Sequence, residues 1–64
     1  MRYKIYVFEK KNLYPKEFYS DSFPKIEGQT LYIRAIDKNW NITLESMPIG
    51  RIDTIIVDLM KLKR

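Results

Sequence analysis

Cysteine and histidine are both absent from this 64-residue chain. Without thiols, neither a disulfide framework nor a thiolate metal site can stabilise the fold, so hydrophobic packing has to suffice. Nucleophilic triads, thiol chemistry and zinc sites built on cysteine or histidine are excluded for the same reason. The sequence therefore gives little support for catalysis by the familiar routes.

Glycine is scarce, and long apolar runs are missing. Gly28 and Gly50 are the two glycines, and they stand alone and far apart, which excludes a glycine-rich phosphate-binding loop. Apolar runs are as short as Ile55-Ile56-Val57, whereas a membrane-spanning helix needs about 20 apolar residues. No signal-peptide pattern opens the sequence. We therefore expect a cytoplasmic protein without a membrane partner.

Acidic side chains are present but scattered. Two carboxylates could still meet in space, as a glycosidase or a hard-metal site requires, but so short a chain has little volume for a deep pocket. We therefore expect a non-enzymatic protein with no metal site and no cofactor. The acidic residues are Glu9, Glu17, Asp21, Glu27, Asp37, Glu45, Asp53 and Asp58.

The chain does contain enough apolar material for one modest core. Hydrophobic residues make up 45% of it, and a chain of this size buries about 60% of the surface that its unfolded state exposes. We expect a single domain, 1–64, with a basic tail, 61–64. Lys61, Lys63 and Arg64 supply three of the twelve basic side chains, which leaves nine basic and eight acidic groups in residues 1–60, a net charge of +1. The high isoelectric point is therefore weak evidence for a nucleic-acid binder.

The stretch 29–46 has the pattern of a β-hairpin. Two alternating runs, 31–36 and 40–44, flank the turn-rich sequence Asp37-Lys38-Asn39. We expect the hairpin to anchor the core, at about 1.5–3 kcal/mol for each fully buried large side chain. The expected anchors are Ile33, Trp40, Ile42 and Leu44.

Further strands are predicted on both sides of the hairpin. Residues 2–8 alternate, and 13–20 read as a strand, although Pro15 is restricted to an edge or a bulge and could instead begin a short helix. Asn12 and Gly28 are the expected positive-φ turn residues. Residues 51–64 fit an amphipathic helix, but Thr54-Ile55-Ile56-Val57 favours a strand through about Asp58. Towards Lys63 we expect the strand to fray or to turn helical.

These elements predict an all-β fold, a small five-stranded antiparallel meander or barrel. The alternative is an α+β fold with a C-terminal helix on a three- or four-stranded sheet.

One functional hypothesis concerns nucleic acid. If Ile5 and Ile33 face the core and their strands are neighbours, basic and aromatic side chains interleave on one exposed face, a composition suited to single strands. Under the competing interpretation, Glu45 and Asp58 lie on that outward face and neutralise the basic groups. The candidate nucleic-acid residues are Lys4, Tyr6, Tyr32, Arg34, Lys61, Lys63 and Arg64.

The leading hypothesis is a protein partner. The segment 13–23 is rich in aromatic residues, and tyrosine is enriched at interfaces, so Tyr14 and Tyr19 are the candidate contact residues. Self-association through an uncovered strand edge is a further candidate. In size, β content and basic ends the chain is similar to small chromatin proteins and to compact accessory or inhibitor proteins of phages and mobile elements. This general likeness assigns no role to any residue. We expect a small regulator or inhibitor that acts by occupying a protein partner.

Overall fold

The computed structural model describes residues 1–60, and the predicted basic tail lies outside them. The described part contains one short 3-10 turn, η1 (Ile49–Arg51), and no α-helix, which confirms the all-β prediction. The helical alternatives for Pro15 onward and for the C-terminal segment are wrong within this part. The strands are β1 (Tyr3–Glu9), β2 (Lys16–Ser20), β3 (Lys25–Glu27), β4 (Thr30–Ile36), β5 (Ile42–Pro48) and β6 (Ile52–Leu59).

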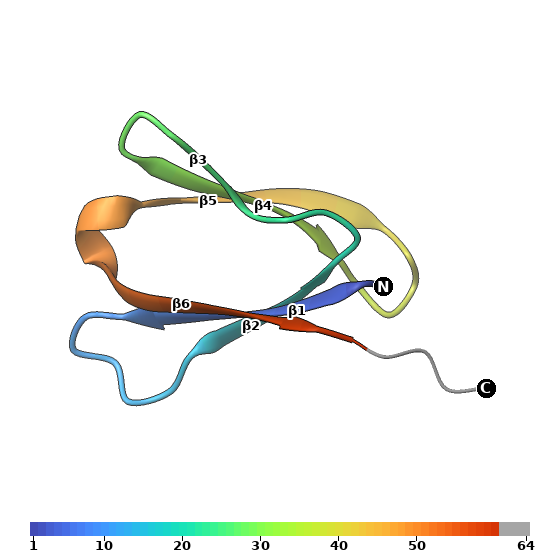
Figure 1. Cartoon of the computed structure of the whole chain (residues 1–64), viewed down its shortest axis with the longest axis horizontal. Helices are drawn as coiled ribbons and strands as arrows, with labels where there is room; N and C mark the ends of the chain where they lie inside the picture. The colour runs from blue at the N-terminus through green and yellow to red at the C-terminus, as the bar shows by residue number, and fades with distance from the viewer. Residues whose placement is uncertain (61–64) are drawn as a thin grey trace.

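The strands form two three-stranded antiparallel sheets, with the orders β2-β1-β6 and β3-β4-β5. The sheets lie in two layers, one above the other (Figure 1). The described strands therefore do not form one continuous meander or closed barrel, because β2 does not pair with β3 and β5 does not pair with β6. Pro24 lies in the first of these connections, and Pro48 ends β5 just before the second, where a missing backbone donor interrupts a ladder.

The core lies between the sheets. Its buried members come from β1, β4 and β5: Ile5, Val7, Leu31, Ile33 and Met47. Strand alternation sends neighbouring side chains to opposite faces, so the expected inward direction of Ile5 and Ile33 is confirmed. Phe18, Ile55 and Val57 are half-buried against this cluster.

The prediction that Trp40, Ile42 and Leu44 anchor the core is wrong. Their side chains are 65%, 58% and 63% exposed, whereas Ile33 is buried as expected. The reason is the cross-strand register, which places Ile33 opposite Glu45. Because directly opposed residues share a face of the sheet, Ile42 and Leu44 belong to the opposite, outer face. Their apolar character could not identify the buried face.

The turns follow the expected chemistry with small shifts. Gly28 has a positive φ of 62°, as expected. At the turn between β1 and β2, the positive φ belongs to Lys11 rather than to Asn12, and the backbone N–H of Asn12 donates to the Glu9 carbonyl. β2 begins after Pro15, so the predicted strand 13–20 is shortened. β6 continues to Leu59, one residue beyond the predicted end.

Candidate functional site

Lys4 is the centre of the outer face formed by β1, β2 and β6. Its ammonium group pairs with Glu17 at 3.0 Å and lies 5.2 Å and 5.3 Å from the ring centroids of Tyr6 and Tyr19. Glu17, followed by the two tyrosines, raises the pKa of Lys4 above its ordinary value. Asp58 stands opposite Lys4 on β6, as expected for an outward-facing acid. This lysine is therefore already neutralised and partly covered by its own neighbours.

Tyr32 and Arg34 lie on the outer face of the other sheet. Tyr32 is half-buried, and it pairs with Lys25 on β3 and with Ser46 on β5. Arg34 is exposed and pairs with Leu44 on β5. Within residues 1–60, Arg34 makes no ion pair, whereas Lys25 pairs with Glu27 at 3.2 Å. Glu45 was expected beside Arg34 on the outer face, but it faces inward with Ile33 and is half-buried, so it does not neutralise Arg34.

The predicted basic and aromatic residues therefore do not share one face. Their strands, β1 and β4, belong to different sheets. Since the inner faces of both sheets pack on one core, Lys4 and Tyr6 point away from it on one side, and Tyr32 and Arg34 on the other. The condition on which the interleaved nucleic-acid surface depends is not met by residues 1–60, and Lys61, Lys63 and Arg64 lie outside them.

The two tyrosines proposed for protein binding are also apart. Tyr14 is 83% exposed in the loop before β2. Tyr19 is half-buried near the other end of β2, beside Lys4. Tyr14 lies in a bend before the strand begins, whereas Tyr19 is the fourth residue of β2. Tyr14 is therefore free to contact a partner, whereas much of the Tyr19 ring is engaged with Lys4.

Further exposed side chains lie on the β4–β5 hairpin and in its turn, at residues that sequence reasoning assigned mainly to the core. We call this set the hairpin surface and define it as Arg34, Trp40, Ile42 and Leu44. Ile42 and Leu44 alternate along the outer face of β5, and Arg34 stands directly opposite Leu44 on β4. Only the register distinguishes this surface from a core face, and no local pattern in the sequence reports the register.

Asp37 holds the turn that leads to this surface. Its carboxylate accepts hydrogen bonds from the backbone N–H groups of Asn39 at 2.8 Å and Asn41 at 2.9 Å. The Asn41 hydrogen bond is the main cause that lowers the pKa of Asp37 below its ordinary value. The backbone N–H of Trp40 donates to the Asp37 carbonyl at 3.0 Å, which closes the tight turn.

Trp40 occupies an unusual backbone position in that turn. Its φ is 63°, in the left-handed region. Three-residue hairpin loops require this conformation at their last residue, where glycine fits without a steric penalty. For a residue with a large side chain the conformation costs of order 1–2 kcal/mol. The turn therefore carries a strained residue whose side chain is mostly in water.

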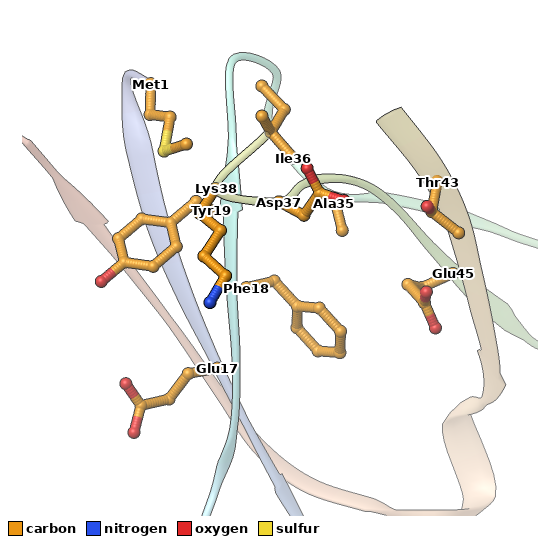
Figure 2. Close-up of a pocket in the computed structure, with 10 residues that line it drawn as sticks. All are labelled: Met1, Glu17, Phe18, Tyr19, Ala35, Ile36, Asp37, Lys38, Thr43 and Glu45. Carbon is orange, nitrogen blue, oxygen red and sulfur yellow. The ribbon is translucent and has the colours of Figure 1, made fainter. Parts of the chain in front are cut away.

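A cleft of about 430 Å³ opens between the two sheets. Figure 2 shows the Phe18 ring between β2 and the β5 residues Thr43 and Glu45, while the Tyr19 ring lies on the other side of β2. Ala35 and Ile36 add apolar walls, and Lys38 reaches in from the turn. The cleft can receive a side chain with an apolar stem. Two of the acidic groups that line it are already engaged, Asp37 in the turn and Glu17 with Lys4.

Residues 1–60 contain no group of three or more His, Cys, Asp or Glu side chains placed to hold a metal ion. The described part also has no helix with the length and apolarity needed to cross a membrane. Comparison with known protein families, curated proteins and solved structures found no match to this chain. The function is therefore inferred from the described residues alone.

Proposed function

We propose that this chain is a small, non-enzymatic protein-binding module that regulates or inhibits a partner by occupying it, and that the partner binds the hairpin surface. Trp40 is the observation that carries the proposal. Its backbone is strained and its ring is 65% exposed, so it adds little to the stability of the fold. Strained residues of this kind concentrate at sites of binding and catalysis.

The chemistry of the hairpin surface suits a protein partner. Tryptophan and arginine are the residue types most enriched among binding hot spots, because they combine large contact area with directed hydrogen bonding. Leu44 provides aliphatic surface opposite Arg34, and Ile42 continues it along β5. The planar guanidinium of Arg34 can donate to a carboxylate in a bidentate geometry. An acidic side chain surrounded by apolar ones on the partner would complement this arrangement.

The nucleic-acid alternative has less support. Lys4 and Tyr6 lie on the other sheet from Tyr32 and Arg34, and Lys4 is paired with Glu17. Fluorescence anisotropy with mixed-sequence oligonucleotides at low salt separates the two functions. Tight binding that weakens steeply as salt rises would favour nucleic acid over a protein partner.

The decisive variant is Trp40→Gly. It removes the ring and also relieves the left-handed backbone, so the thermal midpoint is kept or raised by up to about 8 °C. If the ring is a hot spot worth about 2 kcal/mol, the affinity for a captured partner falls about 30-fold. The measurement is affinity capture from extracts of the native host, followed by titration of the captured protein and a thermal melt by circular dichroism.

Lys11→Gly is the matched control, because Lys11 has the same left-handed backbone, with φ at 69°, in a different turn. It should gain similar stability and leave binding unchanged. Equal capture by the Trp40→Gly and Lys11→Gly variants would refute the assignment of the hairpin surface. Loss of capture in a Tyr14→Ala, Tyr19→Ala double variant that keeps its circular dichroism spectrum would move the contact to the other sheet.

A further inference from the structure

The free edge of β5 is long, and most of it lacks lysine and proline, two of the usual protections against pairing. Within residues 1–60, β5 pairs with β4 alone, so its other side has no strand beside it. Edges are normally blunted by lysine, proline or short length. Among the other edge strands, β2 and β3 are five and three residues long, and each contains a lysine. β6 is eight residues long and has no lysine or proline, but Asp53 and Asp58 place a charge near each of its ends. β5 is seven residues long, and its segment 42–46, with the sequence ITLES, contains neither lysine nor proline.

The hydrogen bonds at both ends of the hairpin determine which backbone groups face this free edge. The N–H of Asp37 donates to Asn41, and the N–H of Ile49 donates to Gln29. Hydrogen-bonded and non-hydrogen-bonded pairs alternate along an antiparallel ladder. From either end, Thr43 and Glu45 are therefore the residues bonded to β4. The N–H and C=O groups that point to the free edge belong to Ile42, Leu44 and Ser46.

We propose that a second copy of this chain pairs with that edge, β5 against β5 and antiparallel, with Leu44 facing its counterpart at the two-fold axis. The residues at the two ends of the extended segment favour a two-fold axis at Leu44. Pro48 has no N–H to donate, and Trp40 has a left-handed backbone that ends the extended segment. Leu44 lies midway between them, so pairing centred there uses every outward-facing group from Ile42 to Ser46.

The side chains agree with the same register. Leu44 meets Leu44 on the outer face, Ile42 lies beside Ser46, and Thr43 lies beside Glu45 on the inner face. No like charges stand opposite one another, whereas a centre at Glu45 would oppose two carboxylates. The self-complementary strand is what an isologous two-fold interface requires. Pairing places two hairpin surfaces next to each other, but it does not depend on the proposed function.

The first test compares Ser46→Pro with Ser46→Ala in sedimentation equilibrium. Proline at position 46 removes an N–H that faces the free edge and spares the ladder to β4, as Pro48 does two residues later in the same strand. Wild type and Ser46→Ala should reach a monomer–dimer equilibrium with a dissociation constant of about 1 mM or below, as expected for a weak interface. The dimer dissociation constant should rise about tenfold or more in Ser46→Pro, because each copy loses one hydrogen bond. Leu44→Lys provides a second blocking variant, which serves if Ser46→Pro does not fold.

The second test is amide hydrogen exchange of the wild-type chain as a function of its concentration. Protection of Ile42, Leu44 and Ser46 should rise with concentration, while that of Thr43 and Glu45 stays constant, because their amides are already bonded to β4. Monomeric wild-type protein at about 1 mM, or a concentration effect without this alternation, overturns the proposal. Neither result affects how much partner protein the Trp40→Gly variant captures. The dimer proposal and the proposed function can therefore be refuted independently of each other.

Discussion

Asp37 is the residue on which the geometry of the hairpin turn depends. Its carboxylate accepts hydrogen bonds from two backbone N–H groups, and the bond from Asn41 is the main reason for its lowered pKa. A group whose pKa is lowered by folding stabilises the fold fully above its unfolded pKa, and this stabilisation is lost as pH falls through the folded pKa.

We therefore expect the turn to loosen as the pH falls below about 4. The amide proton resonances of Asn39 and Asn41 should move together through one acid transition in two-dimensional NMR spectra. In Asp37→Asn the side-chain oxygen still accepts the hydrogen bonds but carries no titratable charge, so both amides should lose that transition. Retention of the transition in this variant would assign it to another carboxylate.

At the scale of single residues, local chemistry was a good guide at some positions and failed at others, as at Asn12, where the positive φ belongs to Lys11. Gly28 has the predicted positive φ, and Asp58 lies on the outward face beside Lys4. Trp40 was misjudged because size and apolarity usually mean burial. Its place in the turn depends on the number of residues between the paired ends of β4 and β5, which composition does not specify.

Strand β5 shows the limit of pattern reading at the scale of elements. Alternation correctly predicted a strand, and the hairpin with β4 is confirmed. Both faces of β5 contain apolar side chains, Met47 on the inner face and Ile42 and Leu44 on the outer. Alternation with a period of two fits burial of either face of β5. The face that is buried is revealed only by the pairing of Glu45 with the buried Ile33.

The same substitution at Ile33 and at Ile42 tests this assignment. Ile33→Val removes a methylene from the core and should lower the free energy of unfolding by about 0.5–1.5 kcal/mol. Ile42→Val changes a surface side chain and should stay within about 0.5 kcal/mol of wild type. Urea denaturation followed by circular dichroism measures both. Equal losses would place Ile42 in the core after all.

At the scale of the whole molecule, the strand order could not be read from the sequence. β1 pairs with β6, so that Tyr3 stands opposite Leu59, almost the full described length of the chain away. Proline and glycine mark where strands end, but they do not say whether consecutive strands share a sheet. The predicted meander assumed that neighbours in sequence pair, which fails between β2 and β3 and between β5 and β6.

Because one core joins both sheets, we expect them to unfold together. Ile5→Val on β1 should lower the stability by about 0.5–1.5 kcal/mol, and the slowest-exchanging amides of β4 should lose the same protection as those of β1, about 2- to 12-fold. Native-state hydrogen exchange provides the comparison. Unchanged protection in β4 would show that the two sheets open as separate units despite their shared cluster of Ile5, Leu31 and Ile33.

The placement of Trp40 has an optical consequence. It is the single tryptophan of the chain, and its indole ring is already mostly in water in the native state. Unfolding therefore changes the surroundings of the fluorophore little, whereas covering by another molecule removes it from solvent. The emission of Trp40 is therefore expected to report any contact that covers the ring more strongly than it reports folding.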